Sequence, residues 1–222
     1  MALNNKNKIY LEAGLLIIFT LIALIFWESP IIYPVKLFVV MLHELSHALM
    51  AIATFGEVKS IKIFFDLGGV SEIEGGNELL VASSGYLGSF IFGSLIFYSG
   101  LNKKAARYIL PSLSFILFIS AIIFFDLIFS ASAIVAAVTF IILGYFINSA
   151  AAEFILKYFG LLSLFYVLFD LRTDVFSNRT HISDATHLSI ILDIPEYIIG
   201  IGWILIACAI LFILLKLYAK KF

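Results

Sequence analysis

Long apolar runs separated by short polar stretches dominate this chain. The runs lie near 11–27, 34–54, 80–99, 106–125, 131–148, 153–170 and 196–217. Each approaches the roughly 20 residues that a helix needs to cross a bilayer. The fourth and fifth runs are separated only by Asp126 and a short turn. The pattern therefore predicts an all-α polytopic membrane protein, with a bundle of six or seven transmembrane helices.

Two of the polar connections show a pattern of their own. Between Gly56 and Asn77, apolar and polar residues alternate on both sides of Gly68-Gly69, which predicts a small β-hairpin. The connection from about 171 to 195 contains a short amphipathic stretch that Ser183 can cap as a helix. We expect one integral membrane domain over residues 1–222, with the hairpin directly after the second span.

Composition supports a membrane protein and excludes one class of partner. Hydrophobic residues make up 63% of the chain, whereas soluble domains have about 45–50%. We therefore expect a multi-pass protein whose surroundings are a lipid bilayer. The formal net charge of −1 supplies no basic surface, so a nucleic-acid partner is not expected. The pattern indicates neither a particular membrane nor an oligomeric state.

The second apolar run, from Pro34 to about Phe55, contains the sequence His43-Glu44-Leu45-Ser46-His47. On a helix, the two histidines lie one turn apart on the same face, where both can bind one Zn²⁺, and Glu44 lies beside the metal as a general base. Placing ionisable side chains inside a bilayer costs free energy, so such residues usually serve a function there. The alternative is a helix whose polar side chains only pack against neighbouring helices.

A catalytic zinc ion has three protein ligands, so a third must come from another segment. We choose Asp184 because His181 and His187 lie three residues to either side, where they can orient its carboxylate or bind the metal themselves. Asp170 is the alternative, since it ends an apolar helix at membrane depth. Either carboxylate could instead cap a helix or pair with an arginine. Further candidates are Asp174, Asp126 and Asp66.

The predicted hairpin follows the histidine motif closely enough to take part in substrate binding. Its edge at Ile61 and Ile63 could hold an extended substrate segment by strand addition. A hairpin that only covers one end of the bundle fits the pattern equally well.

Several of these stretches together resemble the site-2 protease (M50) family, in particular its M50B-like branch. The resemblance rests on Val40–Ala48, the hairpin and Ser84–Ser89, and more weakly on Phe169-Asp170-Leu171 and Ser183-Asp184-Ala185. It implies a zinc-dependent intramembrane endopeptidase with one Zn²⁺ per chain, which cuts membrane-anchored proteins within or near the bilayer. It also implies His43 and His47 as metal ligands and Glu44 as the base.

The chain departs from better-characterised members of this family in two motifs. It contains no Asp-Gly pair, on which the third ligand usually lies, and no G-P-x-x-N pattern in its glycine-rich helix, where it has Gly85-Tyr86-Leu87-Gly88-Ser89. Two other functions therefore remain open. One is a catalytically inactive, metal-binding membrane scaffold, or pseudoprotease. The other is a metal or proton transporter, although the internal repeat common in transporters is not evident.

Overall fold

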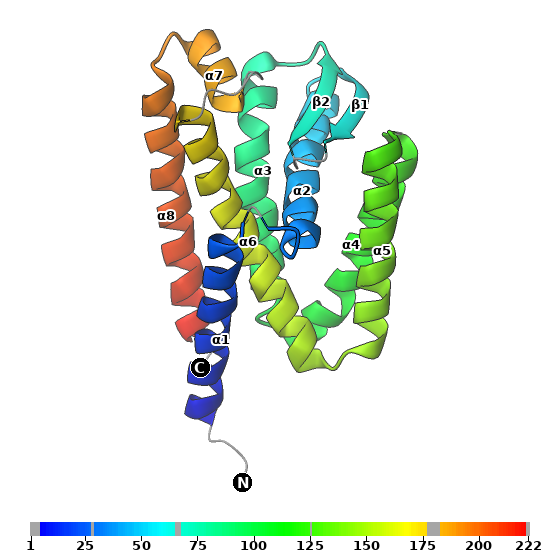
Figure 1. Ribbon diagram of the computed structural model, residues 1–222, viewed down its shortest axis with the longest axis vertical. Helices are drawn as coiled ribbons and strands as arrows, with labels where there is room; N and C mark the ends of the chain where they lie inside the picture. Colours follow the sequence, from blue (N-terminus) through cyan, green and yellow to red (C-terminus); the bar gives the residue numbers. More distant parts are fainter. Residues whose placement is uncertain (1–4, 28, 65–67, 125, 177–182, 221–222) are drawn as a thin grey trace.

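The computed structural model describes residues 5–27, 29–64, 68–124, 126–176 and 183–220 (Figure 1). Over these residues the chain forms eight helices and one two-stranded sheet. In chain order they are α1 Asn5–Ile25, α2 Tyr33–Ala53, β1 Glu57–Ile63, β2 Gly69–Glu74, α3 Glu78–Ser99, α4 Lys103–Ile123, α5 Leu127–Phe146, α6 Ser149–Phe176, α7 Asp184–Leu192 and α8 Glu196–Lys220.

Six of the described helices are long and apolar enough to cross a membrane, namely α2, α3, α4, α5, α6 and α8. The apolar part of α1, Ile9–Ile25, is shorter. The prediction of a multi-pass helical membrane protein with a small hairpin is therefore confirmed. The spans differ in how far the rest of the protein encloses them. The apolar stretch of α2 is 72% buried inside the protein, whereas that of α8 is only 17% buried. The histidine motif thus lies on the most enclosed span.

Polar side chains at the helix starts explain where several elements begin. Asn77, Asn102 and Asp126 accept hydrogen bonds from backbone N–H groups in the first turns of α3, α4 and α5. These groups have no partner inside the helix, so each cap stabilises its helix by about 1 kcal/mol. Asp126, one of the candidate ligands, is therefore the cap of α5. Ser183 caps α7 in the same way, as the sequence predicts.

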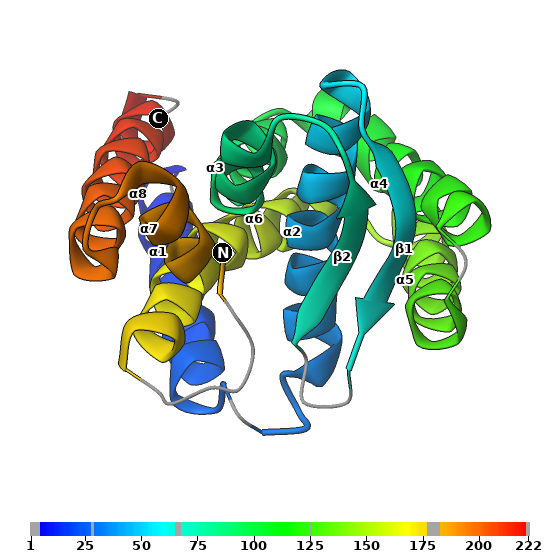
Figure 2. The same cartoon turned by 90° about the horizontal axis from the view of Figure 1, so that it is seen from above.

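Helix α2 lies among its neighbours and contacts α3, α5, α6 and both strands (Figures 1 and 2). Its residues Phe38, Val39, Val40 and Met41 are buried in the larger of two apolar clusters. The second cluster joins α3, α6 and α8, and includes Ala185 and Leu188 of α7. The short helix α7 is therefore docked on the bundle by its apolar side.

Glycines bring α3 close to helices on two sides. Gly88 lies against Ser46 of α2, and an added Cβ would collide with that side chain. Further along, Gly93 lies next to Gly160 of α6, where a Cβ would be 3.0 Å from the carbonyl oxygen. Small residues allow such approaches between membrane helices. Gly88 and Gly93 thus allow α3 to pack closely against α2 and α6.

The two strands form an antiparallel sheet in which Ile61 is opposite Ser71 and Ile63 is opposite Gly69. The side chains of Ile61 and Ile63 are buried beneath the sheet. Both strands contact α2, and β1 also contacts α5. Figure 2 shows β1 between β2 and the α4–α5 pair, so the outer edge of β2 faces the side on which α3 and α7 lie.

A polar cluster joins α1, α6 and α8 toward the end of the bundle where α1 begins and α8 ends (Figure 1). Lys157 is buried and forms an ion pair with Glu12. The hydroxyl of Tyr218 donates to the second carboxylate oxygen of Glu12 at 3.3 Å, and the Lys157 ammonium lies 5.8 Å from the centre of the Tyr218 ring. We call these three residues the ion-pair cluster.

Candidate metal centre

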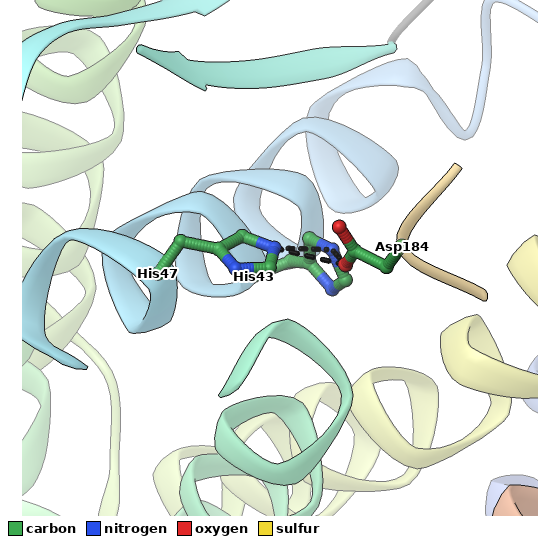
Figure 3. A group of neighbouring side chains, drawn as sticks. All are labelled: His43, His47 and Asp184. Carbon is green, nitrogen blue, oxygen red and sulfur yellow. Dashed lines mark hydrogen bonds and ion pairs between the residues drawn. The ribbon is translucent and has the colours of Figure 1, made fainter. Parts of the chain in front are cut away.

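Three potential metal ligands from two distant segments meet between α2 and α7 (Figure 3). His43 and His47 lie one turn apart on α2, are almost fully buried, and have their Nε2 atoms 3.2 Å apart. Asp184, the first residue of α7, places its Oδ2 atom 3.0 Å from Nε2 of His43 and 2.9 Å from Nε2 of His47. We call these residues the metal group.

The geometry of the metal group fits a small divalent cation. Zinc takes nitrogen and oxygen ligands at about 2.0–2.2 Å in tetrahedral sites, which puts neighbouring ligand atoms about 3.4 Å apart. The three separations in the structure, from 2.9 to 3.2 Å, are close to that value. Two imidazoles and one carboxylate also leave a fourth position for water or substrate, as catalytic zinc sites require. The group could therefore hold one metal ion.

Helix α3 orients the histidines and leaves room for an ion. The Nδ1 atom of His47 lies 2.7 Å from the Val81 carbonyl oxygen, which can only accept, so Nδ1 carries the hydrogen and Nε2 keeps its lone pair. Ser89 Oγ lies 3.5 Å from Nδ1 of His43. A Cβ at Gly85 would lie 2.5 Å from Nε2 of His43, so only glycine keeps this space open.

Hydrogen bonds at the start of α7 hold Asp184 in place. Ser183 accepts the N–H of Thr186 at 3.1 Å and thereby fixes the first turn. The hydroxyls of Ser183 and Thr186 also donate to Oε1 of Glu196, at 3.3 and 3.0 Å. Glu196 is the first residue of α8, so it ties the start of α7 to a membrane-spanning helix.

Asp184 is held in the charged form that a metal ligand needs. Burial alone would favour the neutral acid, but the adjacent rings of His47 and His43, when they are protonated, outweigh it and hold the pKa of the Asp184 carboxyl below its usual range. The side chain is 23% exposed. It is a carboxylate at neutral pH, and a carboxylate is the protonation state that binds metal ions.

Glu44 is buried beside the metal group and contacts β2. The hydroxyl of Ser71 lies 2.7 Å from Oε2 of Glu44 and 3.1 Å from its backbone carbonyl oxygen. Gly69 lies against the same side chain, so closely that an added Cβ would collide with the carboxylate. Sequence reasoning missed these two contacts. The available signal was the pair of small residues on one face of the strand that follows the histidine helix.

The structure separates the predicted site residues into three sets. It brings together His43, His47 and Asp184. It does not bring His187 to them, because that side chain is exposed and His187 is not part of the described metal group. The side chain of Asp170 and the whole of His181 lie outside the described part of the chain.

Substrate binding at Ile61 and Ile63 stays a prediction, and the structure shows where these residues lie. Both residues belong to β1, which contacts α5, and their side chains fill the core beneath the sheet. The strand that contacts Glu44 is β2, through Ser71 and Gly69. The sheet edge near the candidate site is therefore that of β2. The alternation in the sequence predicts the hairpin but does not show which of its edges faces the site.

Comparison with known proteins shows the family of this chain. Neither a search of curated proteins nor a search of solved structures found a match. A model of the family described as Peptidase M50B-like matches residues 16–214, which include all three residues of the metal group, Glu44, the hairpin and most of α8. The match covers far more than half of the chain, and this protein belongs to the Peptidase M50B-like family.

Proposed function

We propose that the protein is a zinc-dependent endopeptidase that cuts membrane-anchored proteins within or near the bilayer. The observation that carries this proposal is the meeting of His43 and His47, on the membrane span α2, with Asp184 of the short helix α7, and with Glu44 buried beside the two histidines. Ionisable groups at this depth are costly and are usually kept for a function. Membership of a peptidase family supports hydrolysis of a peptide bond as that function.

In this proposal His43, His47 and Asp184 hold the metal, and Glu44 transfers protons. A bound zinc ion supplies Lewis acidity, which polarises the substrate carbonyl and lowers the pKa of a water molecule. The Glu44 carboxylate accepts a proton from the attacking water, and it then gives that proton to the nitrogen of the leaving amine. The enclosed position of α2 keeps bulk water from these steps.

A transmembrane substrate must unwind before it can be cut, because a helix uses its own carbonyl groups in hydrogen bonds. The outer edge of β2 offers replacement partners. Phe64 donates its N–H to the Gly68 carbonyl at 2.9 Å, so the alternation of an antiparallel pair leaves the backbone groups of Gly69 and Ser71 pointing away from β1. We propose that an unwound substrate segment pairs with this edge, in place of Ile61 and Ile63.

Substitution of Glu44 by Gln tests the proposal. Zinc content should stay the same, since Glu44 is not a ligand, and cleavage of a membrane-anchored model substrate in liposomes should fall by roughly 10²–10⁴-fold. Glu57→Gln, on the exposed outer face of β1, is the matched control and should behave as wild type. Cleavage retained by Glu44→Gln would refute the mechanism. A zinc-loaded wild-type protein that cuts no membrane protein would instead favour the inactive, metal-binding scaffold.

A further inference from the structure

Two residues of β2 contact the proposed catalytic base, and the reaction described above gives these contacts no role. Ser71 hydrogen bonds to the Glu44 carboxylate, and Gly69 lies against it. We propose that β2 positions Glu44 for proton transfer. Ser71 is the positioning residue, and Gly69 leaves the space that the carboxylate occupies because it has no side chain. This inference rests on the proposed function, because it takes Glu44 to be the base.

Helix α2 fixes the backbone of Glu44 but not its carboxylate. The side chain has three rotatable bonds, and a general base must lie within hydrogen-bond reach of the proton that it accepts. A single donor at 2.7 Å from Oε2 leaves the other oxygen, Oε1, for the water. A hydrogen bond from a neutral hydroxyl to a charged carboxylate is strong enough to select one rotamer over the others. Ser71 therefore sets where the carboxylate lies.

Gly69 supports the same conclusion through a different contact. A Cβ built on Gly69 would overlap Oε1, Cγ and Cδ of Glu44. The Glu44 side chain is flexible and the strand backbone is not, so a methyl group here would move the carboxylate. Gly69 and Ser71 lie on the same face of β2, two residues apart, and together they enclose Glu44.

The backbone and the side chain of Ser71 have separate tasks in this arrangement. Its backbone groups point to the outer edge of β2, where the substrate segment is proposed to pair. Its hydroxyl points to Glu44 instead. Removal of the hydroxyl should therefore lower kcat and leave KM nearly unchanged, whereas a general weakening of the hairpin would raise KM as well.

The first experiment compares Ser71→Ala with Ser71→Thr, which keeps a hydroxyl. Ser71→Ala should lower kcat by roughly 10- to 100-fold, the factor that corresponds to one hydrogen bond to a charged group. Ser71→Thr should recover much of this loss, and zinc content should match wild type in both variants. Ser60→Ala is the matched control, because Ser60 is on the same hairpin but bonds to the exposed Glu72. An unchanged kcat in Ser71→Ala would overturn the proposal.

The second experiment uses Gly69→Ala, which removes no hydrogen bond. It should lower kcat with zinc retained, and Gly202→Ala, where an added methyl group meets open space, should not. If Gly69→Ala keeps the wild-type kcat, the carboxylate does not need this space and the proposal fails.

A third measurement does not depend on turnover. Acetohydroxamate binds zinc and gives up a proton to a neighbouring base, so its affinity for the zinc-loaded protein reports the placement of the Glu44 carboxylate. Ser71→Ala and Gly69→Ala should each weaken its binding, though less than Glu44→Gln does. If both variants bind it as wild type does, β2 does not position Glu44. A wild-type protein that binds the probe but cleaves nothing refutes the proposed function alone.

Discussion

The metal group and the ion-pair cluster are both sets of ionisable side chains held between helices of the bundle, but their charges are balanced differently. In the ion-pair cluster, the ammonium of Lys157 faces the carboxylate of Glu12, so the chain itself supplies the positive charge. In the metal group, two imidazoles and the Asp184 carboxylate direct their ligand atoms at one point. No lysine or arginine is among the described partners of Asp184.

This difference indicates which of the two sets is structural. A buried charge that meets its counter-ion inside the chain needs nothing more, and its removal should be felt in stability. A set of converging ligand atoms that includes no lysine or arginine, and whose imidazoles can lose their protons, is suited to bind a metal cation. Burial inside the protein alone does not separate the two cases. The source of the positive charge does.

The largest effect is expected at the metal group. Asp184→Ala removes a proposed ligand, and zinc content after purification should fall to near zero, well beyond the roughly 10- to 100-fold loss typical of residues that only orient ligands. His187→Ala is the control on the same helix and should keep the metal, since that side chain is exposed. Retention of zinc by Asp184→Ala would move the third ligand elsewhere, with Asp170 the first candidate.

The next largest effect is expected at the ion-pair cluster, where the free energy of unfolding should change rather than the zinc content. Lys157→Met leaves the Glu12 carboxylate without its counter-ion and should lower the free energy of unfolding by about 3–5 kcal/mol. Thermal unfolding in detergent would show this as a lower Tm, while zinc content of the folded protein stays at wild-type level.

The double variant Glu12→Leu/Lys157→Met makes this test sharper. An apolar pair of similar size should restore most of the stability, because the unpaired charge is removed as well. If the double variant is as unstable as Lys157→Met, the cluster contributes more than charge compensation, and the contrast with the metal group is weaker than described.

A smaller effect is expected at Glu196, which joins the start of α7 to α8. Glu196→Ala removes the acceptor for the hydroxyls of Ser183 and Thr186, so Asp184 is held less firmly. Zinc affinity, measured by competition with a chelator, should fall by about tenfold to a hundredfold. Glu78→Ala, in the first turn of α3 and exposed, should leave it unchanged. Equal affinities in the two variants would show that apolar packing alone places α7.

Local patterns in the sequence predicted a large part of this structure. The membrane helices follow from apolar runs, the hairpin from alternation, and the cap at Ser183 from its residue type, because each depends on neighbouring residues only. The motif from His43 to His47 could be recognised for the same reason. Asp184 was chosen for its flanking histidines, yet His187 is exposed and the observed supports are Ser183, Thr186 and Glu196.

Contacts between distant segments could not be predicted in this way. Lys157 and Glu12 are 145 residues apart, and nothing near either residue indicates that α1 and α6 bring them together. Ser71 and Gly69 are close to Glu44 in sequence, but their contact depends on how the hairpin folds back over α2. Even the edge of the sheet that faces the site is set by this docking rather than by the strand pattern.

The short helix α7 gives the metal group a consequence beyond chemistry. Asp184 and His43 are 141 residues apart, so a bound ion would cross-link the chain across a very long loop. Because the two segments meet only in the folded chain, an ion at 100 times its dissociation constant would add about 2.7 kcal/mol of stability to the folded state. Zinc should therefore protect the start of α7 from added protease, and a chelator should expose it. The bound ion would then stabilise the folded state in addition to its proposed part in the reaction.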